Sequence, residues 1–231
     1  MKNNMEYKVS FITDFLRNNS SGLYIAIEGI DGSGKTTQAK LLTDFFKEKK
    51  HPVVFTHEPT RKGLIGKLIH SVLQAKMNIP SVALQYLFCA DRAVHQEQVI
   101  VPSLEEGKIV VSDRCFWSAI AYGIADRKSE NVANTAEIFT VAQSVLSMYH
   151  QFMLPDITFF MDIPLNAAIH RLGDMNKGKE IYEKSDMLHR IKKGYDWMLK
   201  EFPKEFVMIN GTKSVEEIQI EIRKIVGEKL K

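Results

Sequence analysis

Residues 29–36 read Gly-Ile-Asp-Gly-Ser-Gly-Lys-Thr, a spacing of glycines, lysine and threonine that suits a loop wrapped around a phosphate. Glycines let consecutive backbone N–H groups turn inward, and a helix that begins behind the loop adds the positive end of its dipole. An apolar run at 23–27 precedes the loop, and Leu42, Phe45 and Phe46 follow it at helical spacing. The chain is therefore expected to place a strand, a phosphate loop and a helix in succession.

Within this loop, two side chains have expected tasks. Lys35 is expected to reach the β- and γ-phosphates of a nucleotide, and the Thr36 hydroxyl to ligate Mg²⁺. The whole segment is predicted to bind the nucleotide: Gly29, Ile30, Asp31, Gly32, Ser33, Gly34, Lys35, Thr36 and Thr37. A glycine-rich turn with an incidental lysine is the alternative, and the predicted strand and helix on either side argue against it.

Length and composition indicate one domain over residues 22–231. The 231 residues are 45% hydrophobic, enough for a substantial core, and they contain no linker or repeat. A formal net charge of +3 gives no case for a nucleic-acid partner. No apolar run reaches membrane-spanning length, and two cysteines cannot make a disulfide framework. A cytoplasmic protein with no membrane partner is therefore expected.

Residues 1–21 form an extension ahead of the first predicted strand. Its apolar side chains recur at helical spacing: Met5, Val9, Ile12, Phe15 and Leu16. This pattern predicts an appended helix that packs on the domain or on a second subunit, in preference to a membrane anchor.

Apolar strands alternate with helical patterns along the chain. Strands are predicted at 23–27, 53–56, 109–112, 157–161 and 206–209. Helices are predicted around 63–75, 81–106, 116–151 in two pieces, 166–201 and 214–230. This alternation favours an α/β fold of three layers, with a five-stranded parallel sheet and helices on both faces, as in P-loop NTPases.

Ligands in such folds bind beyond the carboxyl ends of the strands. Asp31, the segment 57–59, the pair Asp113-Arg114 and Asp162 are all expected there. An acid that ends an apolar strand is a usual partner of the Mg²⁺ shell, so Asp113 is a predicted metal ligand, and Arg114 offers a bidentate phosphate contact. A solvated ion pair at a strand end is the alternative interpretation of this pair.

Four motifs, in order along the chain, resemble those of the thymidylate kinase family. They are the loop from Glu28 to Thr37, the segment Phe55-Thr56-His57-Glu58-Pro59 with Arg61, the helix motif Leu87-Phe88-Cys89-Ala90-Asp91-Arg92, and Asp113-Arg114 followed by Ser118 and Ala121-Tyr122. The resemblance runs from about residue 23 to the C-terminus. It implies phosphoryl transfer from ATP to dTMP with Mg²⁺, in dTTP biosynthesis, by a homodimer.

The same resemblance implies roles for single residues. Phe88 would stack on thymine, and Arg92, one helical turn later, would hydrogen-bond a base oxygen. Tyr122 would pack on the deoxyribose and Asp31 would lie near its 3′-hydroxyl. The implied substrate-binding set is Asp31, Glu58, Arg61, Phe88, Arg92, Arg114, Ser118 and Tyr122, and the implied catalytic set is Lys35, Asp31, Arg114 and Arg171.

The chain also departs from the family pattern. Cys115 stands where the family usually has Tyr or His after Asp-Arg, and Ala119 replaces a polar residue that many members use at the base. Ser33 stands where some members carry an arginine. A mobile lid over about 171–183 would then supply a cation to the transferring group. Arg171 is favoured for its planar fork, with Lys177 and Lys179 as alternatives.

Two other functions fit parts of the pattern. One is a kinase for another nucleoside monophosphate or for a deoxynucleoside, in which Glu58 would act as the base beside a 5′-hydroxyl. The other is a nucleotide-dependent switch that binds partners. A GTPase of that kind would carry Asn-Lys-x-Asp, whereas residues 176–179 read Asn-Lys-Gly-Lys.

Overall fold

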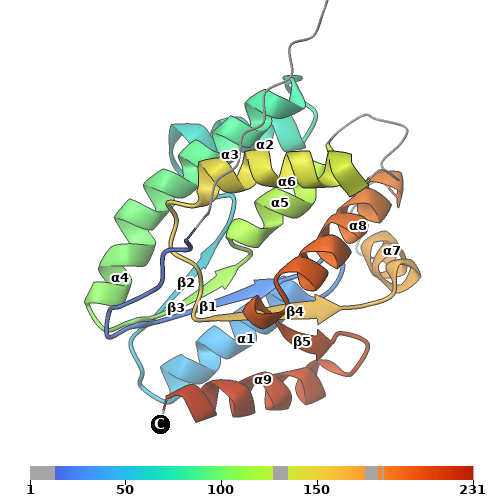
Figure 1. Ribbon diagram of the computed structural model, residues 1–231. Coiled ribbons are helices and arrows are strands. Elements are labelled where there is room, and N and C mark those ends of the chain that lie inside the picture. The colour runs from blue at the N-terminus through green and yellow to red at the C-terminus, as the bar shows by residue number, and fades with distance from the viewer. Residues whose placement is uncertain (1–13, 127–134, 175–181, 184, 231) are drawn as a thin grey trace, which may run out of the picture.

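The computed structural model describes residues 14–126, 135–174, 182–183 and 185–230. Its centre is a parallel sheet of five strands in the order β2-β3-β1-β4-β5 (Figure 1). The strands are β1 (Leu23–Glu28), β2 (Val53–His57), β3 (Ile109–Asp113), β4 (Ile157–Asp162) and β5 (Val207–Asn210). The predicted α/β fold and its strands are therefore confirmed.

Helices cover both faces of this sheet (Figure 1). On one face lie α1 (Lys35–Glu48) and α9 (Val215–Lys229). Ser214 and Glu217 form a capping box at the start of α9. The other face carries α2 (Gly63–Leu73), α3 (Ser81–His95), α4 (Val101–Glu105), α5 (Phe116–Ala125), α6 (Thr135–Tyr149), α7 (Leu165–Asp174) and α8 (Ser185–Glu201).

The central strand β1 is buried on both faces, which explains its uninterrupted apolar run. Ile25 and Ile27 point into the core beneath α1 and α9, and Ala26 points into the core beneath the other helices. Neighbours β3 and β4 pair with β1 along its length. The carboxyl ends of β1, β2 and β3 therefore lie side by side, where the phosphate loop begins.

Two predicted helices are longer than those in the structure. The 81–106 pattern holds α3 and α4, but a π-helical turn at Gln96–Ile100 separates them. The 166–201 pattern holds α7 and α8 as two helices. Apolar periodicity continues through Gln96–Ile100, so it does not reveal the π-helical turn there. Most of the predicted lid, at 175–181, lies outside the described residues.

The predicted N-terminal helix is wrong where the structure describes the extension. Residues 14–22 hold no helix, and Leu16 forms a β-bridge with Met153. Phe15 packs edge-on against Phe116, Trp117 and Phe202. Tertiary contact with this aromatic cluster replaces the helical arrangement that the apolar spacing suggested. Residues 1–13 of the prediction lie outside the described residues.

Within the part of the chain that the structure describes, no helix combines the length and apolar character needed to span a bilayer.

Candidate active site

The phosphate loop joins β1 to α1, as its motif predicts. Gly29, Gly32 and Gly34 have positive φ angles of 141°, 83° and 96°. At Gly32 a side chain is also barred by space, because a Cβ there would lie 2.5 Å from the carbonyl oxygen of Ala168 in α7. These glycines thus let the loop turn tightly beneath α7, so that α1 begins at Lys35 with its N-terminus toward the loop.

Lys35, Asp31 and Arg114 form a compact charged group at this edge of the sheet. Lys35 Nζ donates to the carbonyl oxygen of Ile30 at 2.7 Å and lies 3.7 Å from Asp31 Oδ1. Arg114 Nη2 contacts the same oxygen at 2.5 Å. Burial by itself would raise the pKa of Asp31, but Arg114 and Lys35 outweigh it and lower the value to about 2. Asp31 is therefore ionised at any working pH.

Arg114 occupies the sharp turn between β3 and α5. Its φ is 73°, a value that residues with side chains adopt rarely, and its N–H donates to the carbonyl oxygen of Ile27. Its Nη1 donates to Ser118 Oγ at 3.0 Å, and its guanidinium lies 5.0 Å from the Tyr122 ring centroid. Strained backbone of this kind persists where the surroundings over-determine it, and it is frequent at functional sites.

Beneath Arg114, a fully buried carboxylate joins three elements. Glu28 at the end of β1 accepts from the N–H groups of Cys115 and Ser118 at 2.8 and 3.1 Å. Its other oxygen accepts from Ser118 Oγ at 2.8 Å and from the Tyr195 hydroxyl of α8 at 2.7 Å. Four donors stabilise this charge, which also faces the N-terminus of α5. The carboxylate thereby holds the Arg114 turn in place.

Thr36 and Asp113 meet as the motif predicts for a metal site. Thr36 Oγ1 donates to Asp113 Oδ2 at 2.5 Å. The other carboxylate oxygen, Oδ1, is buried and has no hydrogen-bond partner among the residues that the structure describes. A buried acceptor of this kind, beside a hydroxyl and the phosphate loop, suits Mg²⁺, which keeps several waters and takes one or two protein oxygens. The donor set fits the metal.

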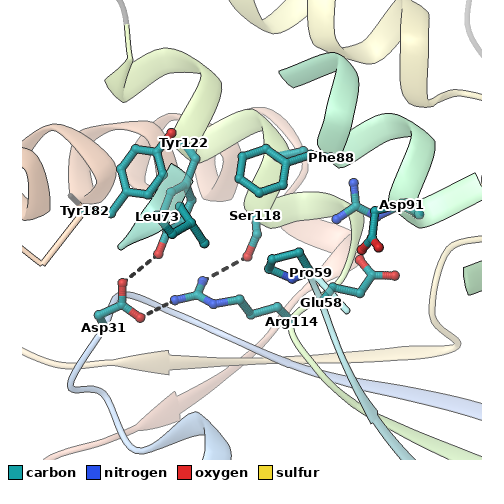
Figure 2. A pocket seen from close by; sticks show the side chains of 12 residues that line it. Asp31, Glu58, Pro59, Leu73, Phe88, Asp91, Arg114, Ser118, Tyr122 and Tyr182 are labelled. Atoms are coloured by element: carbon teal, nitrogen blue, oxygen red, sulfur yellow. Dashed lines mark hydrogen bonds and ion pairs between the residues drawn. The ribbon is translucent and has the colours of Figure 1, made fainter. Parts of the chain in front are cut away.

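A cavity opens beside this charged group (Figure 2). Its lining comes from the phosphate loop, the segment after β2, helices α2, α3 and α5, the turn before α5, and the residue Tyr182 ahead of α8. The lining residues are Asp31, Glu58, Pro59, Leu73, Phe88, Asp91, Arg92, Arg114, Ser118, Ala119, Tyr122 and Tyr182. The Tyr122 hydroxyl donates to Asp31 Oδ2 at 2.9 Å, so the cavity wall is continuous with the phosphate loop. The space can take a flat ring against Phe88 and an anionic group near Arg114.

On the α3 side of the cavity, Arg92 is held by Glu58. Arg92 Nε donates to Glu58 Oε2 at 2.6 Å, and Nη2 donates to the carbonyl oxygen of Cys115 at 3.2 Å. Its Nη1 is buried without a partner among the described residues. Asp91 accepts from the N–H and hydroxyl of Thr60, so α3 also fixes the loop that carries Glu58.

Seven of the eight residues expected to bind substrate line this cavity, and Arg61 does not. It is exposed in the loop before α2. Arg171, the favoured lid cation, ends near the loop after β5 instead, where its Nη2 donates to the carbonyl oxygen of Gly211 at 3.0 Å. Lys177 and Lys179 lie outside the described residues.

Several residues of the site were not predicted from the sequence. Tyr182 packs edge-on against Tyr122, with ring centroids 4.8 Å apart, and donates to Asp126 at 2.6 Å. Tyr195 and His95 also belong to the site, through contacts between distant segments of the chain. No local sequence pattern predicts such contacts. Glu28 alone carried a signal, since it is a charge at the end of a strand that is otherwise apolar.

Comparison with known proteins gives a consistent result. The family model described as thymidylate kinase matches residues 27–222. A probable thymidylate kinase of Pyrococcus horikoshii is 33% identical over 214 residues, covering 90% of this chain and 98% of the relative. A thymidylate kinase of Thermosipho africanus is 35% identical over 209 residues, covering 90% and 99%. The solved thymidylate kinase of Candida albicans superposes with a TM-score of 0.75 at 24% identity, covering 92% and 94%, and supports the fold.

The Lys35 ammonium gives a pH prediction. Burial, aided by Arg114, lowers the pKa of Lys35 to about 8. Binding of ATP phosphates requires the protonated form, so the ATP dissociation constant should be constant below pH 8. Above pH 8 it should rise by up to about tenfold per unit, as the unbound enzyme must take up a proton to bind. Equilibrium titration with ATP between pH 7 and 10 measures this.

Lys35→Ala is the control. It should bind ATP weakly without the pH step and lower kcat by about 100-fold or more. Burial raises the pKa of Cys115, Tyr122 and Tyr195 well above their ordinary values, so these groups stay neutral over the same range. An unchanged pH step or near-normal turnover in the folded variant would contradict the assignment of Lys35.

Proposed function

The chain belongs to the thymidylate kinase family, whose reaction converts dTMP to dTDP with ATP, and on this premise we propose how its residues divide the work. The cavity beside α3 takes the thymine base and deoxyribose of dTMP. The phosphate loop takes ATP, and Arg114 lies between the two. Because the chain belongs to an enzyme family, we assign the phosphate loop to catalysis and drop the alternative of a nucleotide-dependent switch.

One observation carries the base assignment. Arg92 is buried in the cavity wall, and its Nη1 has no partner within the described part of the chain. Burying a donor without a hydrogen-bond partner costs free energy, so we expect Nη1 to donate to an acceptor atom of the ligand. Phe88 lies one helical turn earlier on α3 and also lines the cavity. A ring against Phe88 would present a carbonyl oxygen to Arg92, as thymine does.

Thr36 and the Oδ1 atom of Asp113 would hold Mg²⁺. The ion would neutralise charge on the β- and γ-phosphates of ATP when bound. Lys35 and Arg114 already face three carboxylates, those of Asp31, Glu28 and Asp113. These two side chains therefore leave little net positive charge for a polyphosphate, which is why a metal and a further cation are needed. Arg171, Lys177 or Lys179 would supply the latter.

The transfer itself requires positioning more than a base. Arg114 contacts Asp31 and Ser118, so its guanidinium is fixed where the acceptor phosphate would meet the γ-phosphoryl group. The acceptor phosphate is an anion at neutral pH, so it attacks the γ-phosphoryl group without losing a proton. Asp31 accepts from Tyr122 and would orient the sugar hydroxyl.

The deoxynucleoside kinase alternative meets a physical obstacle. Such an enzyme would use Glu58 as a base, but Arg92 binds one of its oxygens and His95 the other. Burial alone would raise the pKa of Glu58, yet Arg92 and His95 overcome that effect and lower it. A carboxylate so engaged is a weak proton acceptor, which favours a monophosphate substrate.

Substitution of Phe88 and Arg92 tests the base site. Phe88→Ala and Arg92→Ala should each raise the KM for dTMP by roughly tenfold or more, because a stacked ring and a buried hydrogen bond are each worth roughly 1–3 kcal/mol. The KM for ATP should change little. Steady-state kinetics with Mg²⁺ and a panel of dTMP, dUMP, dCMP and dGMP measures both effects.

In this panel, Arg92→Ala should also narrow the preference for dTMP over dCMP, since an arginine donor selects a carbonyl over an amino group. Ile220→Ala, an exposed change on α9, is the matched control. Equal changes in the KM for both substrates, or none for dTMP, would move the base site elsewhere.

We also propose that the chain forms a homodimer through the outer face of α3. Val82, Tyr86 and Val94 project from that helix with 62%, 62% and 42% of their surface exposed. They follow helical spacing and share a face with Ala90, which is also exposed. A contiguous apolar stripe of this kind is typical of a protein interface, and a second copy can present the same stripe to it.

Tyr86→Arg tests this interface. Sedimentation velocity should give a dimer for the parent chain and a monomer for Tyr86→Arg, because a charge would be buried in the contact. Ile220→Arg, an equally exposed apolar residue on the opposite layer, should leave the dimer intact. A monomeric parent chain, or loss of the dimer with Ile220→Arg alone, would refute the α3 interface.

A cytoplasmic location is proposed on the state of the thiols. Cys89 and Cys115 are both free, as expected in a reducing compartment.

A further inference from the structure

A buried histidine lies behind the cavity wall, and the roles described so far do not use it. His95 is the last residue of α3 and is 3% exposed. Its Nδ1 lies 3.0 Å from Glu58 Oε1, and its Nε2 lies 2.5 Å from the hydroxyl oxygen of Thr56 on β2. It touches no lining residue other than Glu58 in these contacts, and it is not itself part of the lining.

The partners of this imidazole determine its tautomer. Ionised Glu58 can only accept a hydrogen bond, so Nδ1 carries the proton. Nε2 shares the second hydrogen bond with the Thr56 hydroxyl, so both nitrogens of His95 are engaged. The side chain is therefore a rigid link from the strand β2 to the carboxylate of Glu58.

Glu58 connects His95 to Arg92, so the position of one side chain depends on the other. One carboxylate oxygen accepts from His95 and the other accepts from Arg92 Nε, at 2.6 Å. The contact of Nε with Glu58 and that of Nη2 with the carbonyl oxygen of Cys115 together fix the plane of the guanidinium. Since Nη2 is held by the Cys115 carbonyl oxygen and the guanidinium lies 4.8 Å from the centroid of the Tyr149 ring, Nη1 has one orientation within the cavity wall.

The helix geometry supports this arrangement. Arg92 and His95 are three residues apart and share a face of α3. Directly after His95 the backbone opens into the π-helical turn at Gln96–Ile100. There Gln96 turns to a different target, donating to the carbonyl oxygen of Met153 at 3.0 Å. π-Helical turns inside α-helices are frequent at functional sites. This turn begins directly after the part of α3 that carries the residues proposed to contact the base.

We propose that His95 is a positioning residue for base recognition, which acts through Glu58 to aim Arg92 Nη1 at a carbonyl oxygen of the substrate base. The inference rests on the proposed role of Arg92. It assigns selectivity for a keto base to a chain of contacts that starts at Thr56, outside the cavity, and not to Arg92 alone.

Two conservative variants separate the two contacts of His95. The amide of Asn stands at the distance of Nδ1 from the backbone, so His95→Asn keeps a donor to Glu58 and loses Thr56. The amide of Gln stands at the distance of Nε2, so His95→Gln keeps Thr56 and loses Glu58. His95→Gln should raise the KM for dTMP roughly tenfold and reduce the preference for dTMP over dCMP, while the KM for ATP stays constant. His95→Asn should stay within about threefold of the parent chain in each.

Gln96→Leu is the matched control, because it removes a neighbouring buried polar side chain that contacts Met153 and not Glu58. It should leave the KM for dTMP unchanged. The double variant His95→Gln/Arg92→Ala should match Arg92→Ala alone, since both changes act on one contact. Thermal melts establish that each variant is folded.

The possible results distinguish the inference from its premise. If Arg92→Ala leaves the KM for dTMP unchanged, the proposed base site fails. If Arg92→Ala raises it but His95→Gln does not, or His95→Gln and His95→Asn behave alike, the role of His95 is overturned. Additive effects in the double variant, or equal shifts in the KM for ATP, would likewise reduce His95 to a structural residue.

Discussion

The arrangement of the site depends on one buried carboxylate. Glu28 has no exposed surface and ends the central strand β1, where the phosphate loop starts. Its oxygens accept from two N–H groups and a hydroxyl at the start of α5, and from Tyr195 on α8. An ion in the interior is stable only when such donors replace its water. The requirement therefore fixes β1, α5 and α8 to one another.

The groups proposed to act in catalysis take their positions from that junction. The Arg114 turn lies between Asp113, which faces Thr36, and the first turn of α5, which binds Glu28. Arg114 then holds Asp31, and Asp31 holds Tyr122. The contacts of Glu28, Ser118, Arg114, Asp31 and Tyr122 thus form one connected polar network from the sheet to the cavity wall, and the Thr36–Asp113 pair lies beside it. Hydrogen bonds in such networks support one another, so a change at the buried end should be felt at the exposed end.

Local chemistry explains what the sequence predicted well. A glycine loop between a strand and a helix has one workable geometry, and acids at strand ends share an edge, so Lys35, Thr36, Asp113 and Arg114 were placed correctly beside one another. Phe88 and Arg92 came from the resemblance to the family motif, and their helical spacing placed them on one face of the predicted helix. His95, Tyr182 and Tyr195 depend on contacts between distant segments, which spacing does not encode. The break at Gln96–Ile100 and the non-helical Phe15 arise because tertiary packing overrides local periodicity.

The most direct measurement of this account is the unfolding free energy of Glu28→Gln, from urea denaturation. The amide keeps the shape but loses the charge that the donors solvate, so stability should fall by about 2–4 kcal/mol, with a large loss of kcat as Arg114 loosens. Exposed Glu105→Gln on α4 is the control and should change stability by less than about 0.5 kcal/mol. A Glu28→Gln variant with the stability and kcat of the parent chain would contradict the account.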